Sequence, residues 1–449
     1  MRKISEKLRN EIESLETIGK PLDKHRVVQI RKYRLVTPLF GGGVTSREND
    51  PSKLIRETSV RGQLRFWWRA MRASGTIGEM KAREDEIFGS GGENARQSKL
   101  FVKVRVTNTE NKKKIFRLEG ERIKAIDEWT KIAYAAFALQ PSQEELRVGI
   151  MPKKVREKVE FEVELSFPED LRSEVEAALW AWETFGGIGG RTRRGFGAIE
   201  LLQIGENEQQ RSVKKYRKET AEDQIREDLR KHLLPNKACH AELPHLSEKT
   251  VFRISAAKDV REAWEVPVEK LRSFRQFRRD KKTGKESPYG KSQWPEPDEI
   301  RRLSGNLQTS IVRKFPDRSG SDDSDSTDLQ TSIVGKFPRA VFGLPIIFHF
   351  PQESGAIPDA TLKPKEFDRL ASPLILRPIA CEDGAVAIAL ILETPRLPKG
   401  GLELEMENKK LDVNAELDSE EAAALTKNGL DVLQNKTDVL EAFLDFFVR

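Results

Sequence analysis

The chain has 449 residues, of which 34% are charged and 37% are hydrophobic. This length suits two or three domains, and the apolar fraction is large enough to build their cores. Two cysteines exclude a disulfide framework, the charged N-terminal stretch lacks the apolar core of a signal peptide, and no apolar run is long enough to span a membrane. We therefore expect a cytoplasmic protein. Its net charge of +7 favours an acidic partner only where the positive charge is clustered.

Residues 1–20 have the apolar spacing of a short amphipathic helix, and residues 27–36 alternate as a strand does. A run of three glycines, Gly41, Gly42 and Gly43, follows the strand. On its own this run indicates a flexible turn. Closeness to the second glycine-rich loop, described below, would make it part of a binding site.

The segment 59–73 predicts a helix with Ser59 as its N-cap. A stripe of arginines runs beside its apolar face, and no acidic residue of the segment lies one turn away. Unpaired arginines on one face favour nucleic acid as the partner; a solvated basic face, or pairing with acids distant in the sequence, is the alternative. Two tryptophans are candidates for stacking on bases, although tryptophans beside an apolar stripe commonly lie in the core. The candidate residues are Arg61, Arg65, Arg69, Arg72, Trp67 and Trp68, with Arg56 just before them.

Further elements complete the first half of the chain. Strands are expected over 100–106, 158–167 and 196–203, and a mixed apolar segment over 123–139. A helix that ends near residue 182 precedes a glycine-rich loop. The mixture of strands and helices indicates an α+β fold.

The glycine-rich loop follows this helix and places six glycines within twelve residues, interrupted by three arginines. Free N–H groups in such a loop can form an anion site, and guanidinium groups beside them favour phosphate. The spacing fits neither the P-loop nor the dinucleotide-binding pattern, so it indicates a polymer backbone rather than a mononucleotide. A glycine-rich turn with solvated arginines is the alternative. The candidate binding residues here are Gly187, Gly189, Gly190, Arg191, Arg193 and Arg194.

The second half begins after a polar connector over 204–220 and is also of mixed type. A strand over 251–256 precedes a helix over 259–279, whose basic end carries Arg275 and Arg278 beside phenylalanines. Such a run can bind nucleic acid, cap the helix or contact a partner subunit.

An internal duplication follows, in which NLQTSIVRKFP (306–316) recurs as DLQTSIVGKFP (328–338) around an acidic serine-rich spacer. We expect the second copy to be structural and to run into a buried strand over 339–350. Apolar segments over 374–379 and 385–392 follow, the second of them a strand, and amphipathic helices over 418–447 end the chain.

Few residues of the sequence are suited to catalysis near its basic segments. Of five histidines only His25 lies near the basic segments, and an exposed histidine is its simpler interpretation. His232, Cys239, His240 and His245 have no standard zinc-site spacing. We therefore expect no catalytic residue, metal or cofactor, and no small-molecule substrate.

Seven strings along the chain together resemble subunit one of the Cmr complex, a RAMP-superfamily family of type III-B CRISPR effectors. The 182–197 string is similar to the glycine-rich loop of RAMP proteins, and SVRGQLR resembles a RAMP helix motif. The duplication departs from this pattern. The strings are TPLFGGG (37–43), IRETSVRGQLRFWWRA (55–70), EIFGS (86–90), WETFGGIGGRTRRGFG (182–197), GKSQWPEPDEIR (290–301), FPRAVFGLP (337–345) and ASPLILRP (371–378).

The resemblance implies two tandem ferredoxin-like (RRM-like) domains. We expect them over 1–210 and 211–449, and the acidic serine-rich composition near 317–327 indicates a low-complexity insertion in the second. It implies a non-catalytic subunit that binds the 3′ region of the guide RNA, target RNA or both, beside other Cmr subunits in antiviral defence. Two alternatives stay open: a metal-independent endoribonuclease that processes guide-RNA precursors, and a scaffold without RNA contact.

Overall fold

The computed structural model describes residues 26–92, 95–206, 209–235, 240, 242–280, 282–287, 289–305, 335–350, 357–407 and 409–449. The helix expected over 1–20 and the acidic insertion lie outside these residues, as does most of the duplication. Among the described residues, no helix combines the length and the apolar character needed to cross a membrane.

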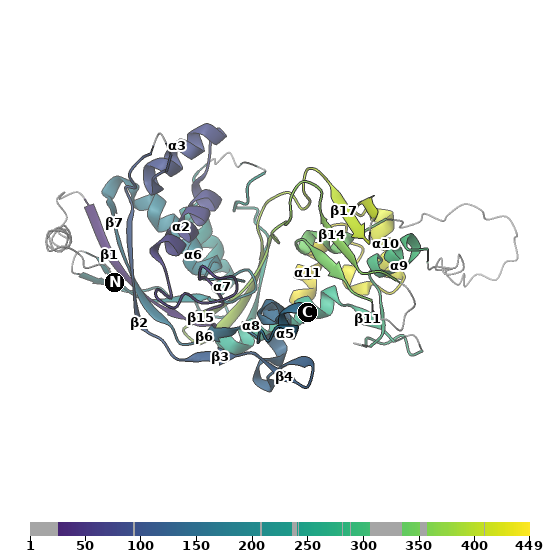
Figure 1. The fold of residues 1–449 in the computed structure, drawn as a ribbon. Coiled ribbons are helices and arrows are strands. Elements are labelled where there is room, and N and C mark those ends of the chain that lie inside the picture. Colours follow the sequence, from purple (N-terminus) through teal and green to yellow (C-terminus); the bar gives the residue numbers. More distant parts are fainter. Residues whose placement is uncertain are drawn as a thin grey trace, which may run out of the picture.

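A five-stranded antiparallel sheet, ordered β2-β7-β1-β8-β9, forms the outer layer of the N-terminal half (Figure 1). Helices α2 and α6 pack together against its inner face, and the chain order is β1-α2-β2-β7-α6-β8, with α3 after α2 and an insertion between β2 and β7. The outer face carries paired charges. The bounds are β1 (Arg26–Leu35), α2 (Glu57–Arg72), α3 (Ile77–Phe88), β2 (Phe101–Asn108), β7 (Glu160–Pro168), η4 (Glu169–Leu171), α6 (Arg172–Phe185), β8 (Ile199–Glu206) and β9 (Gln209–Arg211).

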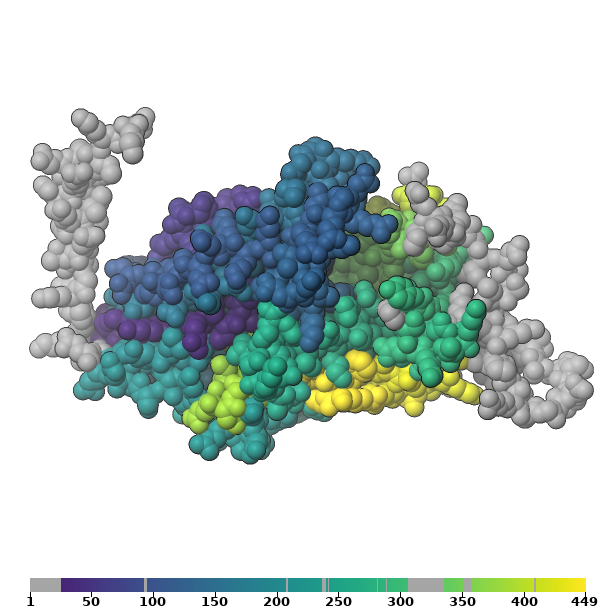
Figure 2. Space-filling view, turned by 90° about the horizontal axis from the view of Figure 1, so that it is seen from below, coloured from purple at the N-terminus to yellow at the C-terminus, as the bar shows by residue number. Residues whose placement is uncertain are grey.

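The insertion between β2 and β7 bridges the two halves. Its buried residues form a core cluster with Phe40 and Phe196 on one side and with Trp264 and Val268 of the C-terminal half on the other. In Figure 2 this blue segment lies across the middle of the molecule, against the teal and green C-terminal half. The bounds are β3 (Lys112–Lys114), β4 (Phe116–Glu119), β5 (Arg122–Ala125), η2 (Asp127–Ile132), α4 (Ala133–Ala136), η3 (Phe137–Leu139), α5 (Gln143–Arg147) and β6 (Lys154–Arg156).

A three-stranded antiparallel sheet, ordered β10-β16-β15, is the central layer of the C-terminal half. One of its faces packs in the same core as α6 and α7, and the other packs against α8 and α11. Burial on both faces explains why β15 and β16 are continuous apolar runs rather than alternating ones. The bounds are α7 (Ala221–His232), β10 (Phe252–Ala257), α8 (Val260–Arg275), β15 (Leu374–Cys381), β16 (Gly384–Ile391) and α11 (Val439–Phe447).

A separate four-stranded sheet, ordered β13-β14-β17-β18, forms the distal end of the C-terminal half (Figure 1). The buried strand expected over 339–350 is wrong in most of its length. Pro338 and Pro345 supply no N–H to a sheet, and Gly343 has φ of 106°, so only a three-residue strand forms after a 3-10 helix. The bounds are β11 (Arg278–Arg279), β12 (Lys291–Ser292), α9 (Glu296–Leu303), η5 (Pro338–Phe342), β13 (Ile346–Phe348), β14 (Ala360–Pro364), β17 (Leu402–Met406), β18 (Lys409–Val413), α10 (Ser419–Lys427) and η7 (Asp431–Leu433).

The expected mixture of helices and antiparallel sheets is confirmed. Two details differ. Helix α2 begins at Glu57, so Arg56 and not Ser59 is its N-cap residue. The central C-terminal sheet has three strands within the described residues, one fewer than a complete ferredoxin-like sheet.

Candidate nucleic-acid interface

The two glycine-rich loops lie against each other. The N–H of Gly190 donates to the carbonyl of Phe40 at 2.6 Å, and the N–H of Gly197 donates to that of Pro38 at 2.9 Å. A Cβ placed on Gly42 would lie 3.4 Å from the Cα of Gly189. The closeness that would make Gly41, Gly42 and Gly43 part of one site with the later loop is therefore present.

This approach requires glycine at particular positions. Gly189 has φ of +85°, and a Cβ there would lie 2.6 Å from the carbonyl oxygen of Phe40. Gly197 has φ of +60°, and its Cβ would lie 1.9 Å from the carbonyl oxygen of Ile188. Both positions combine a backbone conformation that favours glycine with contact distances that no side chain tolerates.

The second loop presents free donors at its tip. Across the described parts of the chain, the N–H groups of Arg191, Thr192 and Arg193 have no acceptor. Arg191 has φ of 59°, a left-handed conformation that is uncommon for a side-chain-bearing residue. Successive N–H groups in a turn of this kind can form a concavity that binds anions.

Two arginines of the loop fasten it to the C-terminal half. Arg194 Nη1 donates to the carbonyl of Leu374 at 2.7 Å, and the guanidinium of Arg193 donates to the carbonyl of Ser372. The carbonyl of Arg193 in turn accepts from the N–H of Leu376 at 3.1 Å. These two side chains, which the sequence assigned to RNA, therefore also position the loop on β15.

Four arginines of the loop and its surroundings lie close enough for their charges to affect one another, and Tyr134 lies beside them: Arg191, Arg194, Arg275 and Arg369. We call these four the arginine cluster. Burial is the main cause that lowers the pKa of Arg191 and Arg194; Tyr134 opposes it, and the charges of neighbouring arginines lower both pKa values further. Arg275 Nη1 donates to the Tyr134 hydroxyl at 2.8 Å.

No carboxylate of the described residues neutralises this cluster. In the part of the chain that the structure describes, none of its four guanidinium groups forms an ion pair, whereas most other half-buried arginines do. Like charges at close range and partly removed from water repel, and an anion bound between them relieves that repulsion. The cluster is therefore a candidate anion-binding site.

Helix α2 differs from its sequence-based interpretation. Trp67 and Trp68 are each 2% exposed and belong to the core, so neither offers a ring face to a base. Arg65 pairs with Glu84 of α3 at 2.5 Å, and Arg69 lies 3.7 Å from the same carboxylate. For these two arginines the alternative of an acid distant in the sequence is correct.

The other arginines in and just before α2, Arg56, Arg61 and Arg72, differ in their burial and in their hydrogen-bond partners. Arg72 is buried and donates to the carbonyl of Ser173 at 2.8 Å. Arg56 Nη2 donates to the carbonyl of Gly42 at 2.9 Å and so anchors the first glycine loop to the start of α2. Arg61 has no partner among the described residues. It is the one member of the α2 stripe that matches the prediction of an unpaired arginine.

The two basic candidates at the end of α8, Arg275 and Arg278, lie in different places. Arg275 joins the arginine cluster, but Phe274 and Phe277 are buried and cannot stack on bases. Arg278 is exposed and lies apart, at a cavity of about 790 Å³ that is also lined by Arg301.

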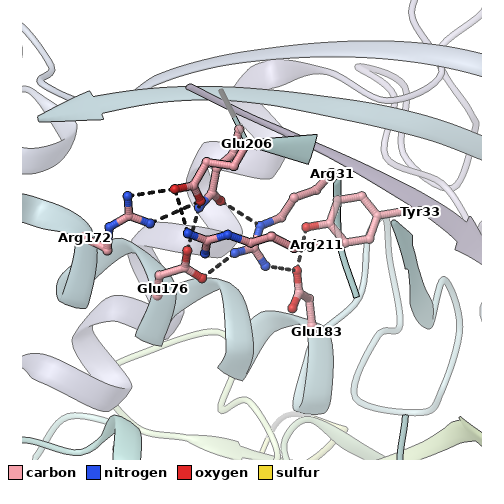
Figure 3. Close-up of polar contacts among 8 residues, drawn as sticks. Arg31, Tyr33, Arg172, Glu176, Glu183, Glu206 and Arg211 are labelled. Carbon is pink, nitrogen blue, oxygen red and sulfur yellow. Dashed lines mark hydrogen bonds and ion pairs between the residues drawn. The ribbon is translucent and has the colours of Figure 1, made fainter. Parts of the chain in front are cut away.

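A buried polar network lies between β1 and α6 (Figure 3). Arg31 pairs with Glu176 and, at 3.0 Å, with Glu183, which also accepts from the Tyr33 hydroxyl at 2.6 Å. Glu206 extends the network toward solvent through Arg172 and Arg211 at 2.8 Å each. Carboxylates, a tyrosine and an arginine could suggest acid–base chemistry, but every one of these groups is paired. We interpret the network as structural.

The histidines do not approach the arginine cluster in the described residues. Burial lowers the pKa of His232 to about 4, and its ring stacks on Trp180. His245 faces Glu393 and His349 faces Asp359. His25 and Cys239 lie outside the described residues, and within the described ones no three metal-ligating side chains converge.

Three residues of the interface escaped prediction from the sequence: Tyr134, Arg369 and Phe137, whose ring lies beside the guanidinium of Arg191. Tyr134 and Phe137 come from the insertion, and Arg369 comes from the loop before β15. The segment 371–378 that follows Arg369 resembled the Cmr family, which was the only signal near it. No local pattern joins these residues to the glycine loop, because the fold alone brings the three segments together.

Comparison with known proteins identifies the family. The model of the RAMP superfamily matches residues 32–200, the span from β1 to β8 that includes both glycine loops. The CRISPR system Cmr subunit Cmr1-2 of Pyrococcus furiosus is 30% identical over 184 residues, which are 38% of this chain and 93% of that relative. The chain belongs to the family of Cmr1 subunits within the RAMP superfamily.

Two solved structures match most of the chain at low identity. The apo crystal structure of Cmr1 from Pyrococcus furiosus covers 93% of this chain and 96% of its own, at 12% identity and a TM-score of 0.45. A chain from the cryo-EM structure of type III-B Cmr-beta bound to cognate target RNA covers 93% of this chain and 100% of its own, at 12% identity and the same TM-score of 0.45.

Proposed function

We propose that this protein is a non-catalytic, cytoplasmic subunit of a type III-B CRISPR Cmr effector complex that binds guide RNA, target RNA or both. The observation that carries the proposal is the arginine cluster without a carboxylate partner among the described residues, beside a loop tip with three free N–H groups. Phosphates are the ligand that guanidinium groups and a turn of N–H groups share. Membership in the Cmr1 family makes RNA and other Cmr subunits the expected partners.

The same proposal includes the domain organisation. We infer two units, 1–210 and 211–449, each derived from a ferredoxin-like module, with the acidic insertion near 317–327 in the second. The β1-α2-β2-β7-α6-β8 order of the first unit supports this. The second unit retains the equivalent β10-α8-β15-β16 order without a fourth strand in the described residues.

RNA binding by the purified full-length chain tests the function. We expect the affinity for labelled single-stranded RNA to fall steeply with salt, because phosphate contacts release counterions. Arg369→Ala should weaken binding and reduce the salt slope by about one contact. Arg105→Ala is the matched control, since Arg105 is also exposed but pairs with Glu162 on the outer face of the sheet. Unchanged affinity in the Arg369 variant would favour a scaffold.

A metal-independent ribonuclease is the second candidate, and one observation favours it. The Tyr134 hydroxyl accepts a hydrogen bond from Arg275 beside the glycine loop, where a RAMP nuclease would place its acid or base. Incubation of the protein with labelled repeat RNA and a chelator separates the two functions. Cleavage that disappears in Tyr134→Phe or His25→Ala would replace the binding role with a catalytic one.

A further inference from the structure

Phe137 is exposed on a segment that otherwise packs inward. Its neighbours Ile132, Ala136 and Leu139 are fully buried in the core of the insertion. Phe137 is 57% exposed, although it is the largest apolar side chain of this stretch. A short helical segment can direct only part of its circumference into a core, and here the aromatic ring has the outward position.

The exposed ring lies beside the arginine cluster. The guanidinium of Arg191 lies 4.3 Å from the centre of the Phe137 ring. No hydrogen bond or ion pair occupies that guanidinium within the described residues. The N–H groups of Arg191, Thr192 and Arg193, also without acceptors in the described chain, lie on the same loop.

A second arginine–phenylalanine pair shows what a purely structural contact looks like. Arg26 lies 5.1 Å from the centre of the exposed Phe101 ring. Its guanidinium donates to the hydroxyl and carbonyl of Ser166 and to the carbonyl of Lys99, so its N–H groups are occupied by hydrogen bonds to the sheet and the residue before β2. Within the described residues the guanidinium of Arg191 makes no such hydrogen bonds, so its N–H groups remain available to a ligand.

We propose that Phe137 is a stacking platform for an unpaired base of single-stranded RNA, with the phosphate of the same strand held by Arg191 and the loop N–H groups. Aromatic rings stack on any base face, and guanidinium groups bind the adjoining backbone. A duplex hides its base faces in its own stack, so the platform selects single-stranded over duplex RNA at this position. This inference rests on the proposed RNA-binding function and adds the kind of RNA that the site accepts.

The test measures fluorescence anisotropy of the full-length protein with three probes: a labelled oligoadenylate, an abasic ribose-phosphate strand of equal length, and the oligoadenylate paired with oligouridylate. We expect the intact single strand to bind about 5-fold to 150-fold more tightly than the abasic strand, the range for one base–aromatic stack. Phe137→Ala should reduce binding of the intact strand to the abasic level, and Phe137→Tyr should retain it. Phe101→Ala, the matched control, should leave all three affinities unchanged.

The outcomes separate this inference from the function on which it rests. Salt-dependent binding of intact and abasic strands with equal affinity would overturn the platform and leave RNA binding in place. Tighter binding of the duplex, or an unchanged preference in Phe137→Ala, would also overturn the platform. Absence of binding to every probe would overturn the RNA-binding function itself.

Discussion

Single residues decide whether the glycine loops can meet. Gly189 has a left-handed backbone, and a Cβ there would lie 2.6 Å from the carbonyl oxygen of Phe40 in the first loop; Gly197 does the same within the second loop, against the carbonyl oxygen of Ile188. Arg191 keeps a left-handed backbone despite its side chain, which places its N–H and its guanidinium at the tip of the loop. Conformations of this kind persist only where the surrounding structure holds them.

Gly197→Ala should destabilise the protein far more than the same change at an open position. Its Cβ would lie 1.9 Å from the carbonyl of Ile188, so backbone strain of about 1–3 kcal/mol adds to overpacking of about 1–3 kcal/mol. Gly149→Ala is the control, because Gly149 has φ of +80° but no atom within 4 Å, and about 1 kcal/mol is expected. Urea unfolding measures both. Equal losses would show that the contact with Ile188 relaxes freely.

Stability should fall in mild acid because of His232. Burial lowers its pKa to about 4 from an ordinary 6.5, although Asp228 opposes this change. Between these values the unfolded chain binds more protons than the folded one, so the free energy of unfolding decreases as pH falls from about 6.5 to 4. We expect a loss of about 1–2 kcal/mol, because solvent still reaches part of the ring and weakens the effect of burial. His232→Phe keeps the stack on Trp180 and should flatten this part of the profile; an equally steep profile would contradict the assignment.

At the scale of elements, periodicity predicted the type of β1 but not which of its faces is buried. Its alternation indicated a strand, and the inward positions turned out to include Gln29, Arg31 and Tyr33 while Ile30 is 43% exposed. Polar groups occupy the inner face because Glu176 and Glu183 of α6 lie opposite, more than 140 residues later in the chain. A pattern within one strand contains no information about such partners.

Arg31→Met should be strongly destabilising because it leaves two partly buried carboxylates of α6 without their cation. Breaking a buried pair from one side costs about 3–5 kcal/mol. Arg34→Met on the same strand is the control, since its pair with Glu200 is on the outer face and its side chain is 49% exposed; a loss below about 1 kcal/mol is expected. Adding Glu176→Gln to the Arg31 variant should recover part of the stability, as measured by urea unfolding. Similar losses in the two arginine variants would show that the network contributes little.

At the scale of the whole molecule, the sequence predicted the glycine loop, an apolar segment where β15 lies and a strand where β16 lies, but not the contact between the loop and β15. Arg194 bonds to the carbonyl of Leu374, and the buried Arg377 of β15 donates to the carbonyl of Ile199 at 2.5 Å. These hydrogen bonds connect segments about 180 residues apart, a relation that no local motif encodes. The arginine cluster is assembled by this docking of the two halves, which explains why Arg369, which lies in no motif of its own, could not be predicted.

The two halves should unfold as one cooperative unit that depends on Trp264. This residue is 1% exposed, contacts Phe196 edge-on and donates from Nε1 to the carbonyl of Arg194 at 2.9 Å, so it links α8 to the glycine loop. Trp264→Ala should cost about 3–5 kcal/mol and remove much of the junction. Calorimetry of the wild type should then give matching calorimetric and van't Hoff enthalpies, and Trp264→Ala should give a broader transition in which they differ.

The size-matched control for that change is Trp294→Ala. Trp294 is fully buried and donates to the carbonyl of Phe274, so both partners lie within the C-terminal half. Its loss should lower the melting temperature, while the contact between the glycine loop and α8 remains. RNA affinity distinguishes the two variants further, because the arginine cluster is assembled across the junction that Trp264 supports. We expect Trp264→Ala to weaken RNA binding at temperatures well below unfolding and Trp294→Ala to preserve it; equal affinities in both would show that the cluster does not need the junction.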